Sequence, residues 1–130
     1  MVARLWRRPA LRDALGAARA GRPLAGIGRA IEERGRRSGF AVVQNLGGHG
    51  IGRAIHEPPN VSNTWDPREK MMLHEGLVLA IEPFLSTRAR WVHQGPDGWS
   101  LCAADDSRCA QFEHTVVVQS GEPIILTAAA

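Results

Sequence analysis

The sequence predicts an α+β fold in which two N-terminal helices cover one face of a mostly antiparallel sheet. Two observations lead to this prediction. Apolar residues recur at helical spacing in the first third of the chain, whereas after Gly39 the pattern changes to short apolar runs bounded by turn residues. A chain of 130 residues is long enough for one domain with one modest core.

Two helices account for the first third of the chain. One face of the first carries Leu5, Leu11, Leu15 and Ala18, with arginines between them. One face of the second carries Leu24, Ile27, Ala30 and Ile31. Pro23 stands near the start of this second helix, and Gly35 and Gly39 are signals that weaken or end it.

Strands are predicted for three runs rich in β-forming residues, at 40–43 (FAVV), 77–81 (LVLAI) and 114–118 (HTVVV). The segments between them carry strong loop signals. These signals are Gly47-Gly48, Pro58-Pro59, Gly95-Pro96-Asp97-Gly98 and Gly121. The order of helix, helix and then several strands is what favours an α+β arrangement.

Positive charge is concentrated near the N-terminus, because ten of the 16 Lys and Arg residues lie between positions 1 and 39. We interpret this as the solvated face of a helix, with a transit peptide or a nucleic-acid patch as alternatives. No apolar core of a secretory signal follows these arginines, and no run approaches the ~20 apolar residues that span a bilayer. We therefore expect no membrane partner and do not favour nucleic acid.

Cys102 and Cys109 are the only cysteines. Two cysteines cannot build a disulfide framework or a tetrahedral sulfur site by themselves. A reducing cytoplasm is the simplest expectation for the location of the protein.

Chemically informative residues lie in three segments. In segment 47–59, four glycines surround His49, and His56 follows seven residues later. Glu82 ends one apolar run and Glu113 precedes another, and a carboxylate buried there needs a cation. One such glutamate is often a salt-bridge partner, but two of them with a glycine-cradled histidine form a ligand set for a hard cation. His114 is expected on the opposite face from Glu113, in a structural role.

Five linked motifs now carry a family resemblance. GHGIG (48–52), HEPPNV (56–61), AIEP (80–83), DGWS (97–100) and QFEHTVVV (111–118) resemble type I methionine aminopeptidases in order, spacing and context. The similarity runs from about residue 11 to residue 127, and this part of the chain resembles the C-terminal half of that catalytic domain. We accordingly divide the chain into an Arg-rich N-terminal extension at 1–10 and this half domain at 11–130.

The resemblance implies a pita-bread fold and the hydrolytic removal of the initiator methionine from nascent polypeptides. His49, Glu82 and Glu113 match three ligands of a two-metal site that takes Co, Mn, Fe or Zn. In that family a metal-bridging water attacks the peptide carbonyl, and Glu82 would move its proton. His56 matches the histidine that contacts the scissile amide. Ile55 and Trp99 match walls of the methionine pocket, although the bacterial enzymes usually have phenylalanine at the position of Ile55.

The resemblance also implies ligands that this sequence lacks. Two aspartates and another catalytic histidine of the family match no residue here, so the sequence predicts three of five ligands and one metal ion or none for this half alone. The chain is then a fragment of an aminopeptidase, or it acts with a partner, which includes a second copy of itself. The alternative is a non-catalytic pita-bread module that binds peptides or ribosomes.

Overall fold

The computed structural model describes residues 2–128, with side chains from Pro9 onward. Helices α1 (Val2–Ala17) and α2 (Ala25–Arg37) come first and only strands follow them. The strands are β1 (Ala41–Val42), β2 (Gly47–Gly50), β3 (Glu57–Ser62), β4 (Val78–Ile81), β5 (Phe84–Ser86), β6 (Val92–Gln94), β7 (Leu101–Ala103), β8 (Cys109–Gln111), β9 (His114–Val117) and β10 (Ile124–Ile125). All their pairings are antiparallel. The predicted α+β class is confirmed.

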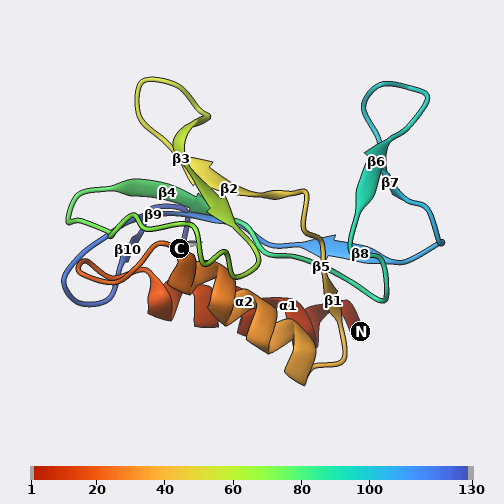
Figure 1. Cartoon of the computed structure of the whole chain (residues 1–130), viewed down its shortest axis with the longest axis horizontal. Helices are drawn as coiled ribbons and strands as arrows, with labels where there is room; N and C mark the ends of the chain where they lie inside the picture. Colours follow the sequence, from red (N-terminus) through yellow and green to blue (C-terminus); the bar gives the residue numbers. More distant parts are fainter. Residues whose placement is uncertain (1, 129–130) are drawn as a thin grey trace.

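The strands form a layer that the two helices cover on one side (Figure 1). Five strands make the main sheet in the order β10-β9-β4-β2-β3, and β1, β5 and β8 make a second sheet. The β2–β3 loop and the β6–β7 hairpin project from the sheets on the side away from the helices (Figure 1). The exposed face of the main sheet is therefore the face that lies nearest to these two projections.

The core lies between the helices and the main sheet. Its buried members include Leu11, Ala14, Ile27, Ile31, Leu79, Ile81 and Val116. Of the predicted helix faces, Leu11 and Ala18 on the first and Leu24, Ile27 and Ile31 on the second are buried in this core, because burial of apolar surface drives helix packing. The side chain of Leu5, predicted on the first face, lies outside the described part. No helix among the described residues is long and apolar enough to span a membrane.

Helix α2 ends as predicted but does not stop at its first glycine. Gly39, at a φ of 75°, lies just beyond the end of the helix. Gly35 instead lies inside the helix, where an added Cβ would come within 2.9 Å of Val42 Cγ2. This glycine allows α2 to pack closely on β1, so its role is close approach rather than termination.

Two segments expected to be loops are strands. Gly47 and Gly48 lie in β2, and Pro58 and Pro59 lie in β3. The prolines are tolerated because β3 is the edge strand of its sheet and carries an irregularity in its pairing between His49 and Gly50. The turn at Gly95–Gly98 is confirmed, since Gly98 N–H donates to Gly95 O at 3.0 Å.

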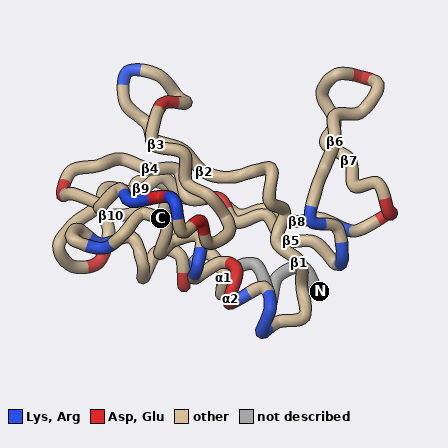
Figure 2. Tube along the Cα trace, in the orientation of Figure 1, with Lys and Arg blue, Asp and Glu red and all other residues tan. Residues whose placement is uncertain are grey.

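Acidic groups lie among the arginines of the described part of the two helices (Figure 2). Arg34 Nε donates to Asp13 Oδ2 at 2.6 Å and so joins α2 to α1, and Arg29 pairs with Glu33 at 3.3 Å. These contacts agree with a solvated helix face. Helix α1 runs through the boundary that we placed after residue 10, and the side chains of residues 1–8 lie outside the described part. The division into an extension and a domain stays a prediction.

Candidate metal site

The register of β4 and β9 brings the two candidate carboxylates together. Ile81, the last residue of β4, pairs with His114, the first residue of β9. Glu82 follows the one and Glu113 precedes the other, so in an antiparallel pair they lie at the same end of neighbouring strands. Two glutamates that are 31 positions apart in sequence thus become neighbours.

His49 joins the carboxylates from the next strand. It pairs with Ala80, and residues two apart on a strand share a face, so Glu82 lies diagonally across from it on the same side of the sheet. The distance from His49 Nε2 to Glu82 Oε1 is 3.6 Å. The two side chains are only 15% and 12% exposed. The sheet therefore positions one nitrogen and one oxygen donor in a mostly buried setting.

A hydrogen bond between the His49 ring and the backbone determines which ring nitrogen can act as an acceptor toward Glu82. His49 Nδ1 lies 2.9 Å from Gly50 O, and a carbonyl oxygen only accepts hydrogen bonds. Nδ1 therefore carries the hydrogen, and in the neutral ring the lone pair of Nε2 points toward the Glu82 carboxylate. Two electron-rich atoms facing each other favour a cation or a proton between them.

Gln111 connects the two carboxylates and was not singled out from the sequence. Its Nε2 donates to Glu82 Oε2 at 2.8 Å and to Glu113 Oε2 at 3.2 Å. Both glutamates thus direct an oxygen at one partially positive amide group. The available signal is that Gln111 precedes Glu113 by two residues, which puts both on one face of an extended segment.

Burial and charge both act on Glu82. Burial is the larger cause that raises the pKa of Glu82, and the neighbouring Glu113 carboxylate raises it further. The hydrogen bond from Gln111 and the proximity of His49 oppose this shift. The carboxylate of Glu82 is thus held in a setting that disfavours its own negative charge.

The three predicted ligands are only partly assembled. Within the described residues, no group of three or more His, Cys, Asp or Glu side chains is arranged to hold a metal ion. His49 and Glu82 lie together, whereas Glu113 is linked to Glu82 through Gln111. The donor types, two carboxylates and one imidazole, fit a divalent cation, and the convergence of the carboxylates on one amide donor agrees with this.

His56 lies beside the candidate ligands, while the two predicted pocket residues are exposed. The rings of His56 and His49 have centroids 4.1 Å apart at an angle of 51°. Ile55, in the β2–β3 loop, is 74% exposed, and Trp99, in the β6–β7 turn, is 90% exposed. The structure thus places His56 at the site but does not close a methionine pocket around Ile55 and Trp99.

Asp97 fixes the turn that carries Trp99. Its Oδ1 accepts from the backbone N–H groups of Trp99 at 3.0 Å and Ser100 at 2.8 Å, and its Oδ2 accepts from Ser100 Oγ. These bonds, with the Ser100 hydroxyl first, lower the pKa of Asp97 from 3.8 to about 2. The carboxylate therefore holds the turn in place at neutral pH.

We predict that the NMR resonance of the Trp99 backbone amide, which reports the protonation of Asp97, shifts with a midpoint near pH 2, well below the ordinary pKa of 3.8 of an aspartate. Because the folded pKa is lowered, the stabilisation is complete above about 4 and is lost as pH falls through about 2. An NMR pH titration of the Trp99 amide measures this midpoint, and a value near 3.8 contradicts the turn as described. Asp97→Asn should remove the titration.

His114 differs from the other histidines near the site. Its Nδ1 lies 2.9 Å from the hydroxyl of Thr127, in the segment after β10. It pairs with Ile81, so it shares the Ile81 face of the sheet rather than the face of Glu82 and Glu113. This placement agrees with the structural role that strand alternation predicts.

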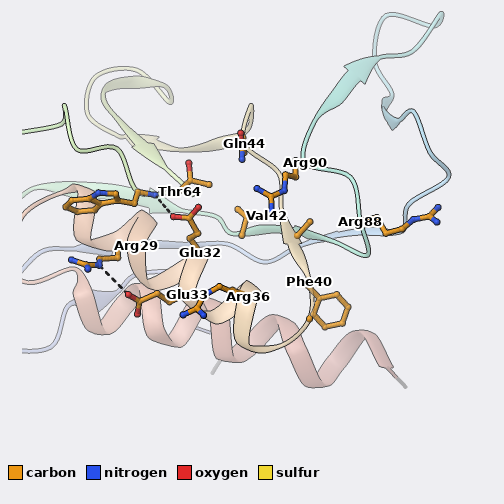
Figure 3. Close-up of a pocket in the computed structure, with 13 residues that line it drawn as sticks. Arg29, Glu32, Glu33, Arg36, Phe40, Val42, Gln44, Thr64, Arg88 and Arg90 are labelled. Carbon is orange, nitrogen blue, oxygen red and sulfur yellow. Dashed lines mark hydrogen bonds and ion pairs between the residues drawn. The ribbon is translucent and has the colours of Figure 1, made fainter.

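A cavity of about 710 Å³ between α2, β1 and the segment after β5 is separate from these residues (Figure 3). Its acidic groups are already engaged. Glu32 accepts from the backbone N–H of Trp65 at 3.1 Å, and Glu33 pairs with Arg29. None of its lining residues is His49, Glu82 or Glu113, so the cavity is not the candidate metal site.

Comparison with known proteins identifies the family to which the chain belongs. The sequence profile of metallopeptidase family M24 matches residues 8–120. The chain belongs to metallopeptidase family M24. The M24 match covers α1 from residue 8 onward, all of α2 and the strands β1 to β9, and so includes His49, Glu82 and Glu113.

Three relatives of this M24 chain are methionine aminopeptidases. Methionine aminopeptidase 2 of Bacillus subtilis is 44% identical over 119 residues, which are 91% of this chain and 48% of the relative. The crystal structure of the Thermotoga maritima enzyme has a TM-score of 0.88 at 36% identity and covers 94% of this chain and 49% of that one. The Rickettsia prowazekii structure has a TM-score of 0.91 at 30% identity, with 98% and 52% covered. The predicted pita-bread half is confirmed as a fold, and the chain spans about half the length of these relatives.

Proposed function

We propose that this M24 chain contributes His49, Glu82 and Glu113 to a divalent-metal site that hydrolyses the bond after an N-terminal methionine. The observation that carries the proposal is that His49 Nε2 lies 3.6 Å from Glu82 Oε1, while Glu82 and Glu113 share the amide group of Gln111. The methionine aminopeptidase relatives support the choice of substrate, the N-terminus of a nascent polypeptide. The assay described below compares Co, Mn, Fe and Zn as the ion.

Each residue has a separate task in this proposal. Bound divalent ions would activate a water and polarise the scissile carbonyl. Glu82, which lies between His49 and Gln111, would accept a proton from that water and pass it to the leaving amine. His56, beside His49, is placed to hydrogen-bond the scissile amide. Ile55 and Trp99, on projecting loops, would contact the methionine side chain once substrate is bound.

The remaining ligands come from outside this sequence in our proposal. The family resemblance requires two aspartates and a further histidine, and the chain spans about half of its relatives. Those residues would be supplied by another segment of the same polypeptide or by a second chain, which includes a second copy of this one. A cytoplasmic location near ribosomes agrees with such a substrate and with the free thiols of Cys102 and Cys109.

A chimera tests the proposed reaction. The segment of the Bacillus subtilis relative that aligns with this chain is replaced by the aligned part of this chain, and methionine release from a Met-Ala-Ser peptide is measured with Mn²⁺, Co²⁺, Fe²⁺ or Zn²⁺. We expect metal-dependent release, reduced about 100-fold or more by Glu82→Gln because general acid–base catalysis contributes that much. The matched variant Glu75→Gln, away from the site, should keep full activity.

The result also separates catalysis from a binding role. A folded chimera that binds metal but releases no methionine contradicts the hydrolytic proposal. It would favour the non-catalytic peptide-binding module, for which the incompletely assembled ligands are the supporting observation. The same assay on this chain alone shows whether three ligands suffice.

A further inference from the structure

We propose that Asn63 is a positioning residue that holds the backbone of the metal-binding segments in register, an inference that rests on the proposed function. Asn63 directly follows β3 and is 1% exposed. Within the described residues it is one of two buried polar residues, the other being Ser86. Burying a side-chain amide without hydrogen bonds destabilises the folded state. The hydrogen-bond partners of Asn63 therefore indicate its role.

The partners of Asn63 are two backbone carbonyl groups at the site. Its Nδ2 donates to Glu82 O at 3.0 Å and to Leu46 O at 3.3 Å. Carbonyl oxygens accept only, so they determine that the amide nitrogen, and not the amide oxygen, faces them. The side chain therefore acts as a double donor between two chain segments.

These two segments, together with β3, carry the proposed functional residues. Leu46 immediately precedes β2, which contains His49, and Glu82 is itself a proposed ligand. Asn63 directly follows β3, the strand that begins after His56. One side chain therefore links the segments that present two ligands and the proposed substrate-binding histidine.

The strand pairing alone does not fix this part of the site. The pairing of β2 with β4 comprises His49 with Ala80 and Gly50 with Leu79. Leu46 and Glu82 lie beyond the end of that short ladder, where no β2–β4 pair holds their carbonyls. The Asn63 amide continues the connection past the ladder and thereby sets the distance between Glu82 and the strand of His49.

The other half of the amide offsets part of the stability that these two bonds contribute. Among the described atoms, Asn63 Oδ1 is buried and has no hydrogen-bond partner. An unpaired buried acceptor destabilises the folded state, which offsets part of the gain from the two bonds of Nδ2. What the amide supplies is the orientation of two carbonyls. Residues that orient metal ligands in this way typically change metal affinity when they are replaced.

The test compares Asn63→Leu with Ser86→Ala in the whole chain. Leucine has a similar size to asparagine but donates no hydrogen bond. Ser86, in β5, is also buried. Its hydroxyl donates to Ala89 O in the loop that follows, and this bond involves neither His49 nor Glu82. Both variants lose a buried bond from a side chain to the backbone. Only the asparagine variant loses a bond at the site.

Two readouts distinguish positioning from general destabilisation. In metal-free protein, we expect the ring NMR resonances of His49 and His56 to move in Asn63→Leu and to stay in place in Ser86→Ala. With Mn²⁺ as the probe, we expect Asn63→Leu to weaken binding about 10- to 100-fold and Ser86→Ala to leave it unchanged. Equal effects of the two variants on both readouts would overturn the proposal.

The outcomes also separate this inference from the proposed function. If wild-type protein binds no Mn²⁺, the proposed metal site fails, while the histidine resonances still report on the role of Asn63. If Asn63→Leu does not fold, Asn63→Ser replaces it, since serine keeps a polar group that is too short to reach both carbonyls. Unmoved His49 and His56 resonances in that variant contradict the positioning role.

Discussion

Replacing Glu82 by glutamine is expected to stabilise the metal-free protein and at the same time to abolish its stabilisation by metal. Glu82 is mostly buried next to Glu113, so its negative charge is unfavourable until a cation is present. Glutamine keeps the shape and removes that charge. Urea denaturation at pH 7 with and without Mn²⁺ measures both effects, because a ligand that binds only the folded state raises its stability.

The pH dependence of this effect follows from the direction of the pKa shift. The folded protein raises the pKa of Glu82 above its ordinary 4.5, so the folded state binds the proton more tightly than the unfolded state. The stabilisation by protonation is therefore present below about 4.5 and is lost as pH rises through the raised pKa. Wild type should lose this part of its stability on going to neutral pH, whereas Glu82→Gln should not.

A matched glutamate provides the control of opposite sign. Glu75 accepts hydrogen bonds from the backbone and hydroxyl of Ser120, and these bonds lower its pKa. Glu75→Gln should thus lower the free energy of unfolding of the metal-free protein at neutral pH and leave its stabilisation by Mn²⁺ unchanged. A Glu82→Gln protein that is less stable than wild type without metal contradicts the electrostatic setting described for Glu82.

Gly48→Ala is expected to cause the largest loss of stability among single-methyl changes. A Cβ at position 48 would lie 2.0 Å from Ala80 O, which is backbone of the adjacent strand β4 and cannot move aside like a side chain. The strands β2 and β4 would have to separate next to His49. Overpacking of this kind costs about 3 kcal/mol, and it should also disturb the approach of His49 to Glu82.

Gly16→Ala is the control with the same chemical change. Gly16 lies in α1, where an added Cβ meets nothing within 4 Å. Alanine should therefore stabilise the helix by about 0.5 to 1 kcal/mol. Chemical denaturation of both variants gives the two free energies of unfolding. Equal, small effects at both positions would contradict the close β2–β4 packing.

Local sequence patterns predicted the elements that obey them. Apolar spacing placed both helices, and β-branched runs placed β4 and β9, because those segments bury the face that their pattern marks. Strand β3 was not predicted, because Pro58 and Pro59 are loop signals in the sequence. An edge strand tolerates proline, but only the order of strands in the folded sheet shows that β3 is at the edge. Local sequence marks Gly48 as a loop signal, because the contact that requires glycine is with Ala80 O of β4, a neighbouring strand that is distant in sequence.

For the candidate site, too, local sequence patterns indicated some residues and missed others. His49, Glu82 and Glu113 stood out because glycines or apolar residues surround them. Gln111 and Asn63 act through distances to Glu82 that only the strand register creates, so no local pattern marks them. The exposure of Trp99 likewise depends on the β6–β7 hairpin projecting from the sheet (Figure 1).

Titration of the purified chain with Co²⁺, followed by visible absorption, tests most directly whether His49, Glu82 and Glu113 form a metal site. A cobalt ion bound by nitrogen and oxygen ligands has absorption bands that report its coordination, and three protein donors are enough to hold one ion. We predict saturable binding of one ion per chain that is lost in His49→Ala and Glu113→Gln. Absence of binding, or equal binding by the wild type and both variants, would show that His49 and Glu113 do not hold a metal ion.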